Sequence, residues 1–278
     1  MKNKYRARNR MPGGRPTVRW VAKSMLVKAT DWMVSPVRSE VSACFVVGCG
    51  HSGTTLVASK LGQHPEVKTI ARETQAFYPN TSLLFAKGMV SEWTFDAVAA
   101  GKTLVVEKTP KHVHCIQRIR QLVPGARFIL LSRTPLDAVA SLFLRFNVFD
   151  VALERWIMDN RAMLRWLDCK DALHVRFEDI VLHPEKGFKR ITHFLGLPWS
   201  SAVLASGDSV YDNPLAVDTM DQRRTQVKKD IYVPVSKWRQ VLSETQIREI
   251  KNQSAGVAEQ LGYGAPDTWG TDTWETDT

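Results

Sequence analysis

Short apolar runs alternate with segments of helical periodicity through the middle of the chain. The runs Ala43–Gly48, Thr103–Glu107 and Arg127–Ser132 are continuously apolar, as is typical of strands buried on both faces. Glu66–Ile70 and Ala172–Phe177 are two further candidate strands. Buried strands separated by helices predict an α/β fold in three layers, α/β/α, with a central parallel sheet. One helix is expected after the strand Thr103–Glu107, through Arg120, and another after the strand Arg127–Ser132, through Leu144. The other expected helices are Thr54–Leu61, Asp150–Leu167, Pro184–Leu195 and Ser243–Leu261.

The two ends of the chain differ in composition from its centre. Residues 1–40 hold ten Lys and Arg against two acidic residues and form a basic N-terminal extension. Apolar residues recur at helical spacing from Val18 to Met33, which predicts a helix packed on the domain or, alternatively, one in weak contact with an anionic membrane surface. Residues 41–264 are expected to form one domain. Residues 265–278, a Trp/Thr/Asp repeat, are predicted to be a disordered tail.

Charge and composition exclude several classes of protein. The 278 residues carry a formal charge of +10, which favours an anionic ligand but does not require nucleic acid. No apolar run is long enough to span a bilayer. Lys23, Lys28 and Asp31 interrupt what would be the apolar part of an export signal. The four cysteines lack a C-x-x-C pair or metal-ligand spacing, so we expect reduced thiols and a cytoplasmic location.

A glycine-rich turn follows the first predicted strand. Residues Gly48 to Thr55 have the P-loop spacing G-x-x-x-x-G-x-[ST] between a strand and a helix. Glycines let backbone N–H groups approach an oxyanion, and the helix start adds partial positive charge. Thr54 stands where nucleoside triphosphatases carry a lysine, so cleavage of a β–γ phosphate bond is not favoured. The turn therefore predicts anion binding rather than an ordinary strand–helix connection. The expected contacts are Gly50, His51, Ser52, Gly53, Thr54 and Thr55.

Two other turns place basic residues at the same edge of the predicted sheet. Lys108 follows the predicted strand Thr103–Glu107, in the sequence EKTP, where it can reach an anion held by the first loop. Arg133 ends the fourth strand and can present a guanidinium fork to a phosphate. Ser141 lies about two helical turns further on, where its hydroxyl can meet the same group. A solvated lysine and a helix-capping arrangement are the structural alternatives.

These motifs together resemble the sulfotransferases that use 3′-phosphoadenosine 5′-phosphosulfate, of the bacterial type with a P-loop-like fold. GCGHSGTT is similar to the family's 5′-phosphosulfate loop, SRTPLDAVAS to its 3′-phosphate motif, and EKTP to a lysine turn of the glycosaminoglycan-modifying branch. VRFEDIVLHPEKGFKRITHFLGLP and the later segment that begins KWRQ are similar to the closing elements of bacterial members. The resemblance spans about residues 43–263, so the domain 41–264 is identified as a sulfotransferase domain.

The resemblance implies a donor site and an in-line sulfuryl transfer to a hydroxyl or amine. Arg133 and Ser141 would hold the 3′-phosphate, Lys237 of the KWRQ segment would join the donor site, and Lys108 would stabilise the leaving bisphosphate. His51 replaces the arginine or lysine that the family commonly has in its loop. It is expected either to weaken charge stabilisation and make activity sensitive to pH or to donate a hydrogen bond to the sulfonate.

Glu73 is the expected general base. It lies in the sequence ARET, which resembles the acidic turn of the tyrosylprotein branch. Glu107 is the competing carboxylate, unless its side chain points away and orients Lys108. Of two nearby histidines, His112 and His114, we expect surface positions rather than a metal pair.

The acceptor is not identified by the sequence. A small molecule, a carbohydrate or a peptide fits equally, and 75–101 and 213–235 are the segments expected to line its site. Neither a metal nor a nucleic-acid partner is expected. The alternative functions are a P-loop kinase and a nucleotide-binding module without chemistry.

Overall fold

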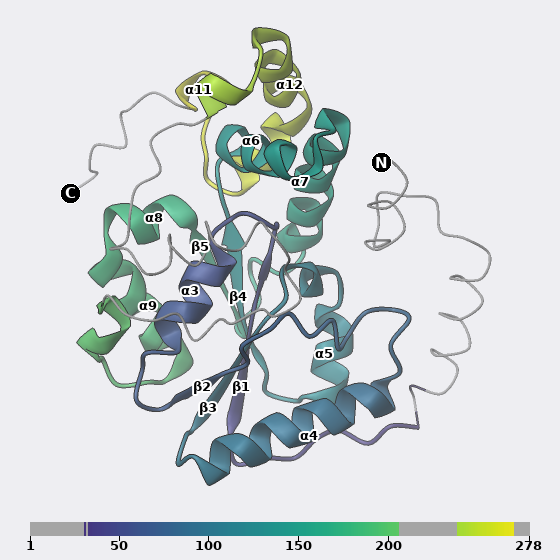
Figure 1. The fold of residues 1–278 in the computed structure, drawn as a ribbon, viewed down its shortest axis with the longest axis vertical. Coiled ribbons are helices and arrows are strands. Elements are labelled where there is room, and N and C mark those ends of the chain that lie inside the picture. The colour runs from purple at the N-terminus through teal and green to yellow at the C-terminus, as the bar shows by residue number, and fades with distance from the viewer. Residues whose placement is uncertain (1–30, 32, 206–237, 270–278) are drawn as a thin grey trace.

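The computed structural model describes Asp31 and residues 33–205 and 238–269 (Figure 1). Several predictions lie outside these residues. They are most of the helix expected from Val18 to Met33, the acceptor-lining segment 213–235, the donor-binding role of Lys237 and residues 270–278 of the predicted tail. Within the described ranges, no helix is long and apolar enough to cross a membrane.

A five-stranded sheet, parallel throughout, forms the centre of the domain. Its strands are β1 (Ser42–Gly48), β2 (Val67–Thr69), β3 (Leu104–Lys108), β4 (Arg127–Ser132) and β5 (Ala172–Arg176), in the spatial order β2-β3-β1-β4-β5. The central strand β1 pairs with both β3 and β4. Its register sets Val46 opposite Lys108 and Gly48 opposite Leu131, so the carboxyl ends of the three strands lie at one edge.

Helices α3 (Thr54–Leu61), α8 (Phe177–Leu182) and α9 (Pro184–Leu195) cover one face of this sheet (Figure 1). Alternate strand residues point to opposite faces, which divides the apolar core into two clusters. The cluster on this face joins Cys44 and Val46 of β1 to Val57 of α3 and Phe188 of α9.

The other face carries the larger cluster, in which Phe45 stacks on Phe128. Its helices are α4 (Leu83–Ala99), α5 (Ile116–Leu122), α6 (Pro135–Phe146), α7 (Phe149–Leu164) and α12 (Glu244–Gln260). Helix α12 begins with a capping box, because Ser243 Oγ accepts from Gln246 N and the Gln246 side chain accepts from Ser243 N. The short helix α11 (Trp238–Val241) precedes it. Helices on both faces of a parallel sheet confirm the predicted three-layer α/β/α fold.

Two tryptophans do not lie where the sequence predicted. Trp93, assigned above to an acceptor-lining segment, is a buried core residue of α4. Figure 1 places α4 across the end of the sheet away from the start of α3. Trp269, assigned to a disordered tail, is 3% exposed and donates from its indole nitrogen to the Tyr263 carbonyl. A tryptophan with an apolar pocket and a hydrogen-bond acceptor gains more from packing than from solvation.

Candidate active site

The turn between β1 and α3 depends on two glycines with positive φ. Gly48 has a φ of 141°, and a Cβ there would lie 2.1 Å from the Leu131 carbonyl oxygen. Gly53 has a φ of 84°, and a Cβ there would lie 2.2 Å from the Phe177 ring. Side chains at these positions would collide with their neighbours, so the loop geometry requires glycine.

The first turn of α3 is open to an anion. Gly53 is the N-cap and supplies no side-chain acceptor, and no acidic residue lies in the first turn. The first N–H groups of a helix have no partner within it and carry its partial positive charge. Ser52 and Thr54 are buried, while Thr55 is half-buried. The prediction that this loop binds an anion therefore has a geometry that fits it.

His51 joins this loop to the turn after β4. Its backbone has a φ of 69°, unusual for a residue with a side chain. Its Nδ1 lies 2.7 Å from Ser141 Oγ, and Arg133 Nη1 donates to the His51 carbonyl at 3.4 Å. The structure thus brings together three predicted donor-site residues that lie far apart in the sequence.

The guanidinium of Arg133 is held in place but keeps a hydrogen-bond donor without a partner. Its guanidinium lies over the Phe177 ring at 4.7 Å, and Nη2 is 3.7 Å from Asp137. Burial raises the pKa of Asp137, which the Arg133 charge opposes. Arg133 Nε is buried and has no hydrogen-bond partner in the described part of the chain. A buried donor without a partner is costly, so an anion that accepts from it would be favoured.

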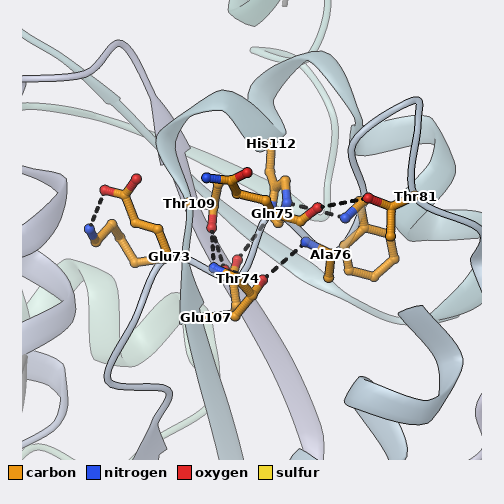
Figure 2. A network of polar contacts seen from close by, with 10 residues as sticks. Glu73, Thr74, Gln75, Ala76, Thr81, Glu107, Thr109 and His112 are labelled. Carbon is orange, nitrogen blue, oxygen red and sulfur yellow. Dashed lines mark hydrogen bonds and ion pairs between the residues drawn. The ribbon is translucent and has the colours of Figure 1, made fainter. Parts of the chain in front are cut away.

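Lys108 and Glu73 form an ion pair at the end of β3. Lys108 Nζ donates to Glu73 Oε1 at 2.7 Å. Figure 2 labels Glu73 and marks this contact of its carboxylate with a dashed line. The lysine side chain is 3% exposed, whereas that of Glu73 is 38% exposed. The ammonium is thus held inside the domain edge, and the carboxylate can be reached by a second molecule.

Glu107 has a different task from the one expected. It is 1% exposed, and its Oε1 accepts from Thr74 Oγ1 at 2.9 Å and from Thr109 Oγ1 at 2.6 Å. Thr74 N donates to Thr109 Oγ1 at 3.0 Å. In Figure 2 this network lies beside Glu73 and holds the turn that carries it. The interpretation that Glu107 orients Lys108 is therefore wrong, because neighbouring strand residues point to opposite faces and Glu107 instead anchors Thr74.

The expectation that His112 lies on the surface is also wrong. His112 is fully buried, accepts from Phe77 N through Nε2 at 3.3 Å, and approaches Glu107 Oε2 through Nδ1 at 3.0 Å. Nδ1 must therefore carry the proton and donate to the carboxylate. Burial alone would raise the pKa of Glu107, but His112 and the two threonine hydroxyls outweigh it and lower that pKa. His114 lies largely buried, 2.7 Å from Asp159 Oδ1.

Tyr78 lies close to this network. Its ring packs edge-on against His112, with 5.8 Å between the ring centroids. Burial raises the pKa of its hydroxyl, and the negative charge of Glu73 raises it further. Of the residues assigned to the acceptor site from the sequence, Tyr78 is one that the structure places near Glu73.

The site also contains a residue that the sequence did not reveal. Arg155 of α7 approaches Gly50, because a Cβ on that glycine would lie 3.3 Å from Arg155 Nη2. More than a hundred residues separate the two positions, and no motif joins them.

Among the residues that the structure describes, no group of three or more His, Cys, Asp or Glu could hold a metal ion. A reaction without a metal stays a prediction.

Comparisons with known sequences agree on one family. A family model described as "Sulfotransferase family" matches residues 84–201. A putative protein-tyrosine sulfotransferase of Caenorhabditis elegans is 30% identical over 207 residues, which cover 65% of this chain and 76% of the relative. Protein-tyrosine sulfotransferase A of the same nematode is 24% identical over 79% of this chain. The chain spans only 66% of that longer relative, and 55% and 64% of two others.

Solved structures share the fold. The sulfotransferase domain of the Synechococcus olefin synthase has a TM-score of 0.59 and 22% identity, over 84% of this chain and 99% of that domain. A mouse sulfotransferase complexed with adenosine 3′,5′-bisphosphate (PAP) has a TM-score of 0.52 and 15% identity, over 86% and 93% of the two chains. At these identities the likeness concerns the three-layer fold.

Proposed function

The chain belongs to the sulfotransferase family, and we propose that it transfers a sulfuryl group from 3′-phosphoadenosine 5′-phosphosulfate to an acceptor hydroxyl or amine. The observation that carries the proposal is the position of His51, which contacts both Arg133 and Ser141. A loop suited to the 5′-phosphosulfate thereby adjoins a turn suited to the 3′-phosphate. The mouse structural neighbour complexed with PAP supports the same donor.

Each end of the donor has residues that suit it. Loop amides and the first turn of α3 would bind the 5′-phosphosulfate. Arg133 Nε is the buried donor that a 3′-phosphate oxygen would satisfy. Ser141 can accept from His51 Nδ1 and donate its own proton to the same phosphate.

The Glu73–Lys108 pair would carry the chemistry. The acceptor oxygen or nitrogen attacks sulfur in line with the bridging oxygen, a new bond to sulfur forms, and the bond from sulfur to the bridging oxygen breaks. Glu73 takes the acceptor's proton, and Lys108 stabilises the negative charge on the leaving PAP. A loose transition state, as in phosphoryl transfer, leaves the protein mainly with positioning and charge stabilisation to supply.

A peptide tyrosine is the acceptor we propose. Several relatives are named protein-tyrosine sulfotransferases, and exposed Glu73 beside the partly buried Tyr78 can meet an incoming phenol. The C. elegans protein that is 30% identical carries the same description of its activity. The cytoplasmic location stays a prediction.

Ligand-dependent stability tests the donor. At a hundredfold excess over Kd, PAP should stabilise the fold by about 2.7 kcal/mol, which corresponds to a rise in Tm of about 5–10 °C. AMP and ATP at the same concentration should change the Tm by much less, because neither fills a 3′-phosphate site. An equal shift with ATP would favour the kinase alternative. No shift with any of the three nucleotides would contradict nucleotide binding.

Replacing Arg133 by Ala should weaken PAP binding about 10- to 100-fold in calorimetric titration. The change removes a charge-assisted contact of about 1.5–3 kcal/mol. Arg165→Ala provides the control, since Arg165 is the exposed arginine that caps the C-terminus of α7, and the variant loses the same charge. An unchanged Kd in Arg133→Ala would remove Arg133 from the site, whereas an equal loss in both variants would indicate only long-range charge.

A further inference from the structure

Arg155 lies beside the phosphate-binding loop without a known role. Its side chain is 15% exposed, and its Nε donates to Asp159 Oδ2 one helical turn later in α7. Its Nη2 faces the loop, 3.3 Å from where a Cβ on Gly50 would stand. Within the described residues, neither terminal nitrogen of Arg155 donates a hydrogen bond. An anion in the loop would therefore meet available guanidinium donors.

The loop itself lacks a full positive charge. Residues 48–55 contain neither lysine nor arginine. The imidazole of His51 is engaged with Ser141, and Lys108 is paired with Glu73. A phosphosulfate carries negative charge, and backbone amides alone compensate it only in part. Arg155 is a described cation whose side chain approaches the loop backbone at Gly50.

Arg155 lies near a second basic residue, and the two share one buried carboxylate as a neighbour. Asp159 is shared, with one carboxylate oxygen on Arg155 and the other on His114. Lys111, from the 3₁₀ helix Pro110–His114, lies in the same cluster. Burial lowers the pKa of Lys111 to about 8, and the neighbouring Arg155 charge lowers it further, against the effect of Asp159. A bound anion would relieve this repulsion.

We propose that Arg155 is a donor-binding residue that contacts the 5′-phosphosulfate and supplies the cationic charge missing from the loop. The inference rests on the proposed function, because it requires an anionic donor in this loop. The competing explanation is structural: Arg155 and Asp159 would only support the backbone at Gly50. The two explanations differ in how they affect ligands with and without a 5′-phosphate.

Calorimetric titration with two nucleotides separates them. Adenosine 3′-monophosphate and PAP share the 3′-phosphate and differ only in the 5′-phosphate. Arg155→Gln should weaken PAP binding about 10- to 100-fold, the effect of one charge-assisted contact, and leave the Kd of the monophosphate within about twofold. Arg155→Lys keeps the charge but loses the fork, so it should restore part of the PAP affinity. Arg161→Gln, an exposed arginine on the same helix, is the control and should bind both ligands as the wild type does.

Each remaining outcome contradicts the inference. Equal weakening of both nucleotides in Arg155→Gln and Arg155→Lys would show a structural role, as would a shared fall in Tm without ligand. PAP affinity within twofold of the wild type in Arg155→Gln would exclude contact with the 5′ group. If Arg155→Gln does not fold, Arg155→Lys decides, because a structural role predicts no selective effect on PAP. Failure of the wild type to bind PAP would instead overturn the proposed function itself.

Discussion

Replacing Glu73 by Gln should reduce sulfuryl transfer to a tyrosyl peptide by about 10²–10⁴-fold and leave the Kd for PAP nearly unchanged. A positioned general base contributes about this much, and an amide cannot take the acceptor's proton. The exposed carboxylate can reach an acceptor, while the donor contacts are made by other elements. The variant should also fold normally, because the turn is held by the contact of Thr74 with Glu107 and does not depend on the Glu73 side chain. Turnover under saturating donor and calorimetry with PAP are the two measurements.

Glu185→Gln provides the matched control for this variant. Glu185 forms an exposed ion pair with Lys189 on α9, also at 2.7 Å, so the chemical change is the same at a distant place. Its turnover should equal that of the wild type. If Glu73→Gln retains near-normal turnover with a peptide that the wild type sulfates, Glu73 is not the base. Glu107 would not take its place, because its oxygens are occupied by buried hydrogen bonds.

The sheet could be predicted from the sequence because each strand carries its own signal of burial. Each run of apolar residues, such as Ala43–Gly48, signals burial on both faces by itself, and glycine spacing marks the turn that follows. Parallel strands have their carboxyl ends at one edge, so the sequence alone assigns the motifs after β1, β3 and β4 to one site. The contacts of His51 with Arg133 and Ser141 agree with that assignment.

Side-chain partners could be predicted less well. Period-two alternation sets Glu107 and Lys108 on opposite faces of β3, which argues against one side chain orienting the other. The burial of His112 could not be foreseen, because it depends on a turn some 35 residues earlier that supplies Phe77 N. Arg155 and Gly50 meet through the packing of α7 against the end of β1, and neither residue belongs to a pattern that names the other.

The burial of Trp269 could not be predicted from the composition of its segment either. Trp269 stands in a repeat of Thr and Asp that has the composition of a disordered segment. A single tryptophan nevertheless packs if a preceding helix presents an apolar surface, here at the end of α12 with Tyr263. Composition averages over a segment, whereas burial is decided for one side chain at a time.

Replacing Lys108 by Met should lower turnover by about 10²–10³-fold, the usual effect of removing one preorganised donor from a developing negative charge. Met fills the buried volume of the lysine stem without its charge, so the fold should persist. Lys189→Met is the control, because Lys189 is the exposed ion-pair partner of Glu185, and this variant should retain full turnover. Single-turnover measurements with saturating donor report the transfer step directly.

The double variant Glu73→Gln/Lys108→Met tests whether the two residues act together. If Glu73 and Lys108 serve one transfer step across their 2.7 Å ion pair, turnover in the double variant should fall little below that of the worse single variant. Lys108 holds the Glu73 carboxylate in place through this ion pair, so much of the effect of either change is already present in the other. Effects that multiply fully would show independent roles, with Lys108 acting away from the base. Near-normal turnover in Lys108→Met would remove the lysine from the reaction altogether.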